Sequence, residues 1–253
     1  MAKSAIIFKA VDGDGRPDAY EREFQEAGID VTIIPPIDFT FCNLDVLFEK
    51  LNDPGSYSGI IFTSPRAVKG VALSLGDQGT LNPGWKTCSI FVVGESTSRC
   101  LLDHLGLESE GKESGNAKEL GEEIAKREFS KPLLFPCGNL KTDTLPQFLM
   151  GKNIYVEEVM VYETCQHPLL EENLNGVLKE RVPDFIIFFS PSGVKYTVPM
   201  MKSSQYSLDK VKLISIGPST TAALLDHGIN VWATAKKPNP CSLLEAIVTL
   251  RNE

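Results

Sequence analysis

The sequence contains the same pattern twice, and this internal duplication constrains the fold more than any other feature. The matching segments are 59–68 with 185–194, 93–98 with 216–221 and, more weakly, 6–9 with 133–136. The three pairs occur in the same order, at offsets of 126, 123 and 127 residues. We therefore interpret the 253-residue chain as two copies of a unit of about 126 residues.

Each copy alternates short apolar runs with segments of helical periodicity. We expect strands over 5–8, 31–34, 59–62, 89–93, 133–135, 155–161, 185–189, 213–216 and 230–232. We expect helices over 18–27, 44–51, 66–75, 95–105, 116–127, 141–150, 170–179, 193–201, 218–227 and 241–251. Continuous apolar runs are typical of strands buried on both faces of a parallel sheet. The alternation predicts an α/β fold with parallel sheets flanked by helices.

Two divisions into domains are compatible with this duplication. Each copy could form one domain. The segment 35–39, with sequence Pro-Pro-Ile-Asp-Phe, is instead typical of an extended crossing, because proline continues neither a helix nor a central strand. Its counterpart in the second copy is 161–165. If both segments are linkers, one domain spans 40–160 and the other combines the two chain ends.

The composition excludes several classes of protein. The chain has 25 Lys and Arg residues against 33 Asp and Glu residues, whereas a general nucleic-acid binder needs clustered cations. Its apolar runs are shorter than the roughly 20 residues of a membrane span, and the first run is too short for a secretory signal. The six cysteines form no C-x-x-C pair and no zinc spacing. We therefore expect reduced thiols in a cytosolic protein.

Small and hydroxyl residues follow five of the expected strands, at 63–66, 94–97, 136–139, 190–193 and 217–220. In an open parallel sheet, ligands bind beyond the carboxyl ends of the strands. Helix starts at these positions offer unpaired N–H groups and a partial positive charge, which suit phosphate or carboxylate. For each single junction the alternative is a simple helix cap. Five junctions together favour a cleft that binds a polyanion.

Tyr162 ends an apolar run at the second expected crossing. A phenol at this point could exchange a hydrogen bond with a ligand or assist the loss of a hydroxyl group. The alternative is an aromatic residue that packs the linker.

Several of these segments resemble uroporphyrinogen-III synthase, and the animal form more than the bacterial one. They are 60–68, 133–141, 161–164, 188–193 and 216–222. The resemblance implies two related α/β lobes joined by a two-stranded linker, with the active site in the cleft between them. It implies lobe one at 1–36 plus 168–253, lobe two at 40–160, and linker strands at 37–39 and 161–167. It also implies a cytoplasmic monomer without a metal or an organic cofactor.

The same resemblance implies a hydro-lyase of porphyrin and haem synthesis. Its substrate would be hydroxymethylbilane, a linear tetrapyrrole with many carboxylates, which closes to uroporphyrinogen III with inversion of the last ring. Tyr162 would assist departure of the hydroxyl group. The residues expected to hold substrate carboxylates are Thr63, Ser64, Ser96, Thr97, Gly138, Asn139, Ser190, Ser192, Ser219 and Thr220, with charge added by Lys9, Arg66, Lys141 and Lys212.

Other functions remain open at this point. The same junctions would serve a two-lobed binding protein for an anionic small molecule without turnover. A member of the family that has lost its activity and acts in signalling is a third possibility. For the enzyme, a transient contact with the preceding deaminase is conceivable, whereas neither nucleic acid nor a membrane is expected as a partner.

Overall fold

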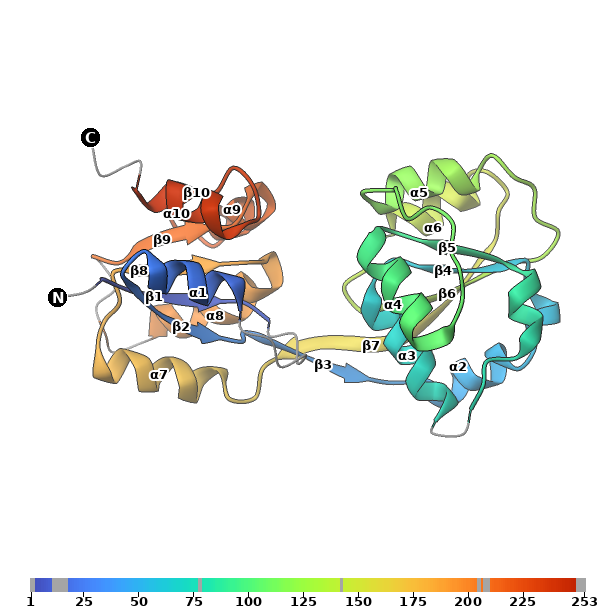
Figure 1. Cartoon of the computed structure of the whole chain (residues 1–253), viewed down its shortest axis with the longest axis horizontal. Coiled ribbons are helices and arrows are strands. Elements are labelled where there is room, and N and C mark those ends of the chain that lie inside the picture. Colours follow the sequence, from blue (N-terminus) through green and yellow to red (C-terminus); the bar gives the residue numbers. More distant parts are fainter. Residues whose placement is uncertain are drawn as a thin grey trace. The chain divides into compact units, whose positions relative to one another are not determined.

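The computed structural model describes residues 3–10, 18–76, 79–141, 143–203, 206 and 210–248. The chain divides into two compact units (Figure 1). Unit 1 combines Met1–Asp38 with Cys165–Glu253, and unit 2 is Phe39–Thr164. Both unit boundaries fall inside the segments expected to be linkers. Each unit contains a sheet whose central strands run parallel and are flanked by helices, which confirms the predicted fold class.

Unit 1 contains a sheet with the strand order β10-β9-β8-β1-β2. Its strands are β1 (Lys3–Phe8), β2 (Ile29–Ile34), β8 (Phe185–Phe188), β9 (Lys212–Ser215) and β10 (Ala233–Thr234). Its helices are α1 (Ala19–Glu26), α7 (Leu170–Glu180), α8 (Pro191–Ser203), α9 (Pro218–Asp226) and α10 (Pro240–Val248).

Unit 2 contains a sheet with the strand order β3-β7-β6-β4-β5. Its strands are β4 (Gly59–Phe62), β5 (Ser89–Val92) and β6 (Leu133–Gly138), together with β3 (Ile37–Phe41) and β7 (Val156–Gln166), which both run across the unit boundary. Its helices are α2 (Leu44–Leu51), α3 (Pro65–Leu75), α4 (Glu95–Leu105), α5 (Ala117–Ile124) and α6 (Thr144–Met150), with short 3-10 turns at Pro54–Ser56 and Pro83–Thr87.

The two sheets have the same internal order, but neither unit corresponds to one sequence repeat. In unit 1 the order β2-β1-β8-β9 matches β7-β6-β4-β5 in unit 2. The first repeat supplies β1 and β2 to unit 1, and β4 and β5 to unit 2. The second repeat does the reverse, with β6 and β7 in unit 2 and β8 and β9 in unit 1. Each unit is therefore assembled from the first part of one repeat and the second part of the other.

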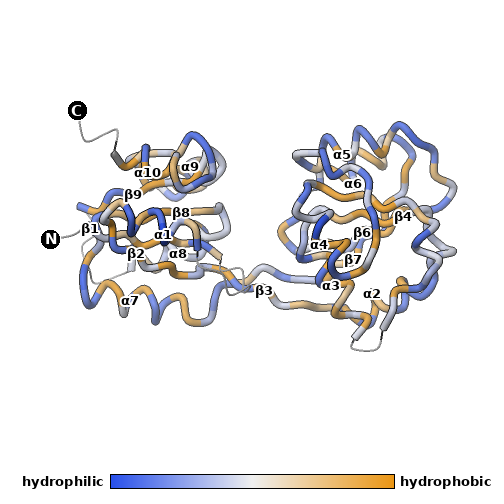
Figure 2. The backbone as a smooth tube through the Cα atoms, in the orientation of Figure 1, coloured by the Kyte–Doolittle hydropathy of each residue, from blue (hydrophilic) through white to orange (hydrophobic). Residues whose placement is uncertain are grey.

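In unit 1 both faces of the sheet are buried, because alternate residues of each strand point to opposite faces. Ala5 and Ile7 of β1 pack with α1 and α10, while Ile6 and Phe8 pack with α7, α8 and α9. All four residues of β8 are buried. Figure 2 shows this pattern in colour: hydrophobic residues recur along the central strands, and hydrophobic and hydrophilic residues alternate along α7.

Unit 2 repeats this arrangement with the corresponding helices. One face of its sheet packs on α2, α3 and α4, and the opposite face packs on α5 and α6. β4 and β6 are buried along their whole length. The continuous apolar runs thus correspond to strands covered on both faces, as predicted from their composition.

Most expected elements occur within a few residues of their predicted bounds, and the clearest error lies near the C-terminus. The strand predicted at 230–232 is wrong, because β10 is Ala233–Thr234. Trp232 already donates its N–H to Leu213 O, so pairing with β9 begins two residues later than hydropathy suggests. Helix α6 starts at Thr144 rather than at 141, after a turn in which Lys141 N–H donates to Gly138 O. The predicted helix end at 249–251 lies outside the described residues.

Helix caps explain where several helices begin and end. Ser64 accepts a hydrogen bond from Ala67 N–H at the start of α3, and Asn116 accepts from Lys118 and Glu119 N–H at the start of α5. Gly106 and Gly228 follow α4 and α9 with φ values of 64° and 71°, a conformation that favours glycine. Among the described residues, no helix is long and apolar enough to cross a membrane.

A polar cluster closes the amino edge of the unit 2 sheet, where its strands begin. Glu157 of β7 accepts hydrogen bonds from Lys50 Nζ and, at 2.8 Å, from the Tyr57 hydroxyl. The ring of Tyr57 stacks on that of buried Trp85, whose indole N–H donates to Leu51 O. The hydrogen bond from Lys50 holds the pKa of the Glu157 carboxyl below its ordinary value.

We predict that Glu157→Gln destabilises the protein more at pH 7 than at pH 3.5. A carboxyl whose pKa is depressed by folding stabilises the fold above its unfolded pKa, and this contribution is lost as the pH falls through the folded value. Urea unfolding at both pH values measures the difference, with exposed Glu122→Gln on α5 as the control. An equal loss of stability at the two pH values would show that the ion pair contributes nothing.

Candidate functional site

Apart from Lys212, the predicted site residues lie at or near the carboxyl edge of one or the other sheet, where the strands end. In unit 2 the neighbouring strands β6 and β4 continue into α6 and α3, which cover opposite faces of the sheet. In unit 1 the same is true of β1 and β8, which continue into α1 and α8. Where neighbouring strands continue into helices on opposite faces, a crevice forms beyond the strand ends. This is the usual ligand position in open α/β sheets.

In unit 2, Tyr162 and Ser64 meet at this point. The Tyr162 hydroxyl lies 3.1 Å from Ser64 Oγ, and Ser64 Oγ also accepts the N–H of Ala67 at 3.3 Å. Tyr162 belongs to β7 and Ser64 precedes α3, so the contact joins segments 98 residues apart. It brings a phenol to a helix N-terminus, where the partial positive charge of the helix favours negative charge.

Two aromatic contacts extend this group. The Tyr162 ring packs edge-to-face on Phe39 of β3, with ring centroids 6.3 Å apart. The guanidinium of Arg66 lies 3.5 Å from the centroid of the Phe39 ring. Stacking on an aromatic face retains the charge of an arginine while limiting its motion. Arg66 therefore places a positive charge against Phe39, the ring on which Tyr162 packs.

The residues after β6 are largely occupied by contacts within the protein. The Lys141 ammonium lies 2.8 Å from Asp143 and 2.7 Å from Glu158, and these hydrogen bonds raise the Lys141 pKa. The Asn139 side chain accepts the N–H of Thr164 at 2.9 Å and donates to Thr164 O at 3.4 Å. Gly138 is buried beside the Tyr162 ring. Direct binding of substrate by these three residues stays a prediction.

The starts of α4 and α9 each present one hydroxyl and bury the next. Ser96 and Ser219 are exposed, whereas Thr97 and Thr220 are each only 1% exposed. Consecutive helical residues point about 100° apart, so the two hydroxyls of a Ser-Thr pair face different directions. The serines are thus accessible in this structure, and the threonines pack against their own unit.

In unit 1, Lys9 follows β1 and forms an ion pair with Asp18, at 2.6 Å. Asp18 also caps α1 by accepting the N–H of Tyr20. Burial opposes ionisation of the Asp18 carboxyl, but the hydrogen bonds from Lys9 and from Tyr20 N–H outweigh it and lower its pKa. The charge of Lys9 is therefore already balanced within the protein.

The start of α8 resembles that of α3. Ser190 Oγ accepts the N–H of Gly193 at 3.0 Å and lies 3.1 Å from Ser192 Oγ. Thr63, which directly follows β4, is half-buried like Ser190 and Ser192. All three hydroxyls therefore lie at a carboxyl edge and retain some exposure.

Lys212 does not lie with this group, and its role in substrate binding stays a prediction. It is the first residue of β9 and pairs with Phe185, the first residue of β8. Its ammonium lies 4.1 Å from the centroid of the Trp232 ring. A strand of four residues spans about 10 Å, which places Lys212 at the amino edge of the sheet. This agrees with the strand expected over 213–216, which Lys212 directly precedes.

Sequence reasoning also missed a set of hydroxyls at the end of the unit 1 sheet. Ser215 Oγ of β9 lies 2.5 Å from Thr221 Oγ1 of α9, and Thr221 lies 2.8 Å from Thr234 of β10. In unit 2, Ser109 donates to Ser98 of α4 at 2.9 Å. Ser98 and Thr221 are equivalent in the repeat, which is the signal that could have identified these paired hydroxyls. These hydrogen bonds tie α9 to the ends of β9 and β10 in unit 1, and α4 to Ser109 in unit 2.

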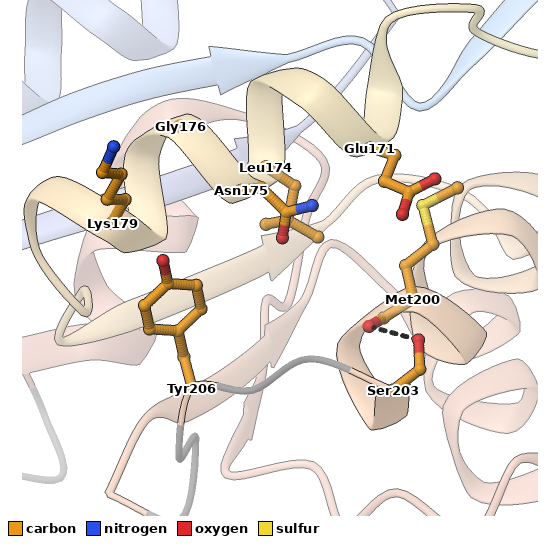
Figure 3. Close-up of a pocket in the computed structure, with 8 residues that line it drawn as sticks. All are labelled: Glu171, Leu174, Asn175, Gly176, Lys179, Met200, Ser203 and Tyr206. Carbon is orange, nitrogen blue, oxygen red and sulfur yellow. Dashed lines mark hydrogen bonds between the residues drawn. The ribbon is translucent and has the colours of Figure 1, made fainter.

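No cluster of three His, Cys, Asp or Glu side chains that could hold a metal ion occurs in the described part of the chain. A pocket of about 480 Å³ lies in unit 1 between α7 and the C-terminal half of α8 (Figure 3). Its lining includes Glu171, Lys179, Met200 and Tyr206 and none of the predicted site residues. This pocket is therefore separate from the carboxyl edge.

Comparison with known proteins identifies the family. Residues 18–245 match the family described as uroporphyrinogen-III synthase HemD. The chain belongs to the uroporphyrinogen-III synthase family. The uroporphyrinogen-III synthase of Saccharomyces cerevisiae is 28% identical, with 91% of this chain and 90% of the relative covered. That of Schizosaccharomyces pombe is 27% identical, with coverages of 99% and 98%.

Solved structures agree in fold. A uroporphyrinogen-III synthetase from Helicobacter pylori has a TM-score of 0.67 at 21% identity, with 99% of this chain and all of that chain covered. A mutant uroporphyrinogen III synthase from Thermus thermophilus has a TM-score of 0.63 at 16% identity, with both chains fully covered. The match to the family over residues 18–245 confirms the predicted resemblance. Family membership makes the chain a cyclising lyase of porphyrin synthesis that acts on a tetrapyrrole.

We predict that Ser64→Ala and Asn116→Ala each lower the free energy of unfolding by about 1 kcal/mol, the usual cost of a lost N-cap. Both side chains accept backbone N–H groups at a helix start, but only Ser64 contacts Tyr162. Urea unfolding measures the stability, and turnover is measured on the same samples. We expect turnover to fall in Ser64→Ala and to stay unchanged in Asn116→Ala. Equal turnover in the two variants would show that Ser64 has no role in the reaction.

Proposed function

We propose that the chain converts hydroxymethylbilane to uroporphyrinogen III, with loss of water and inversion of the last pyrrole ring. The observation that carries the proposal is the contact of Tyr162 and Ser64 at the carboxyl edge of unit 2, in a chain of this family. The reaction needs one group that assists departure of a hydroxyl and many groups that hold carboxylates. The carboxyl edges of the two sheets offer both.

The chemistry of the first step demands little from the protein. The pyrrole nitrogen of the first ring expels the hydroxyl group, and a proton from Tyr162 converts it to water. The last ring then attacks through its substituted carbon and gives a spiro intermediate, which opens and closes again with that ring inverted. A ring proton lost at the end restores the phenol. Tyr162 thus acts as a general acid and then as a base.

Orientation supplies the selectivity. An unaided chain closes through the unsubstituted carbon of its last ring to the other isomer, so the enzyme must favour one geometry in the transition state. A site that achieves this needs neither a nucleophile nor a pair of buried acids. The Tyr162–Ser64 contact, fixed between β7 and α3, provides the rigid reference point.

Neutral donors are suited to the carboxylates of the substrate. Lys9 and Lys141 are balanced by acidic partners, whereas Ser96 and Ser219 are exposed at the first turns of α4 and α9. Helix N-termini bind anions through unpaired N–H groups and need no lysine. We therefore assign carboxylate binding to the helix starts and their accessible hydroxyls, with Arg66 as the added charge.

We further propose that the protein works as a cytoplasmic monomer. The absence of a membrane-spanning helix in the described residues is compatible with this location. A transient contact with the preceding deaminase would shorten the time in which its product closes spontaneously.

The isomer that forms is the direct test of the proposed function. Hydroxymethylbilane generated in situ is incubated with the chain, and the products are oxidised and separated. We predict type III product in the presence of the chain and type I in its absence. Only type I product at the spontaneous rate would instead support a binding protein for an anionic small molecule.

Tyr162→Phe tests the assigned role of the phenol. We predict that kcat falls by about 10- to 100-fold, at or below the usual range for a general acid, because the hydroxyl leaves easily. Affinity for product should change little, since the ring and its contact with Phe39 remain. Stopped assays and product titration measure the two quantities. An unchanged kcat would assign Tyr162 to packing.

A further inference from the structure

An irregularity in the pairing of β6 with β7 sets the position of Tyr162. Up to Cys137 the two strands pair in regular steps, with Cys137 opposite Met160. The next pair is Gly138 with Tyr162, so Val161 has no partner on β6. A bulge of this kind redirects the side chains beyond it, and bulges are frequent beside active sites. Here it brings Tyr162 level with the last residue of β6.

Gly138 provides the space that the phenol occupies. A Cβ atom at position 138 would overlap the Tyr162 ring, at 2.5 Å from Cε2 and 2.8 Å from the hydroxyl oxygen. Real Cβ atoms do not approach other atoms so closely. The ring therefore lies directly over the Gly138 backbone and packs on Phe39 as well.

Asn139 holds the bulge in place. Its backbone N–H donates to Tyr162 O at 3.2 Å, and its side chain accepts the N–H of Thr164 at 2.9 Å. These hydrogen bonds fix the β7 backbone at Tyr162 and two residues beyond it. Movement of the strand would break both, so the backbone that carries the phenol is constrained.

From these contacts we infer that Gly138 is a positioning residue for the reaction, and that Asn139 supports it. By seating the phenol over a residue without a side chain, Gly138 brings the Tyr162 hydroxyl within hydrogen-bonding distance of Ser64. The Ser64–Tyr162 contact uses one of their two hydroxyl protons, which leaves the phenol further capacity for a ligand. The inference rests on the proposed role of Tyr162 and adds the residues that make this role possible.

The test combines a spectroscopic and a kinetic measurement on the full chain. With tyrosine labelled at ¹³Cζ, the Tyr162 resonance is assigned by its loss in Tyr162→Phe. We predict that Gly138→Ala shifts this resonance and lowers kcat by about the same factor as Tyr162→Phe, 10- to 100-fold. The Gly138→Ala, Tyr162→Phe double variant should lose no more than about twofold beyond Tyr162→Phe alone, because both changes remove one function.

Two further variants keep this test decisive. Gly121→Ala is the matched control, because Gly121 is a buried glycine of the same unit whose added Cβ would meet Phe148 and Leu145, not Tyr162. It should leave the resonance and kcat unchanged. If Gly138→Ala fails to fold, Asn139→Ala adds no atoms and should shift the same resonance with a smaller fall in kcat.

The outcomes separate this inference from the proposed function. An unmoved Tyr162 resonance in Gly138→Ala, or losses that multiply in the double variant, would overturn the positioning role. A different result is a shifted Tyr162 resonance in Gly138→Ala together with an unchanged kcat in Tyr162→Phe. Gly138 would then still position the phenol, but Tyr162 would have no role in the chemistry.

Discussion

The pairing of β1 with β8, and of β6 with β4, is the interaction on which the rest of the structure depends. Each pair joins strands from different sequence repeats, and in each unit it forms the centre of the sheet. Neither repeat can complete a sheet alone, so the chain must cross between the units twice, through β3 and β7. The same pairs mark where the helical connections change face, and this fixes the position of the candidate site.

The duplication did not produce two equivalent sites. At the offset of 126 residues, Tyr162 corresponds to Pro36, which has no group that can exchange a proton. Pro36 lies against Gly193 at the start of α8 in unit 1, near Ser190, the counterpart of Ser64. Both units therefore offer helix N-termini for anions, while the position that Tyr162 holds in unit 2 is taken by a proline in unit 1. An acidic chain can bind a polycarboxylate in this way, because backbone N–H groups do not enter its net charge.

The sequence predicted the fold well because its signals are repeated and local. Buried strands such as β4 and β8 are continuous apolar runs, and Ser64 and Asn116 are caps that act within one turn of helix. The site was predicted less completely, because its details depend on contacts between distant segments. The pairing of Lys9 with Asp18 and the burial of Thr97 each follow from tertiary packing. The bulge at Gly138 depends on register, which a single strand does not encode.

We propose that helix starts at the carboxyl edge of each sheet bind tetrapyrrole carboxylates through backbone N–H groups. Titration of the ¹⁵N-labelled chain with uroporphyrinogen III under anaerobic conditions, followed by amide chemical shifts, tests it most directly. The account predicts the largest shifts at 63–67, 94–98, 190–194 and 217–221, together with Gly138 and Asn139. Shifts confined to the pocket between α7 and α8, or to the amino edges of the sheets, around Glu157 in unit 2 and Lys212 in unit 1, would contradict this proposal.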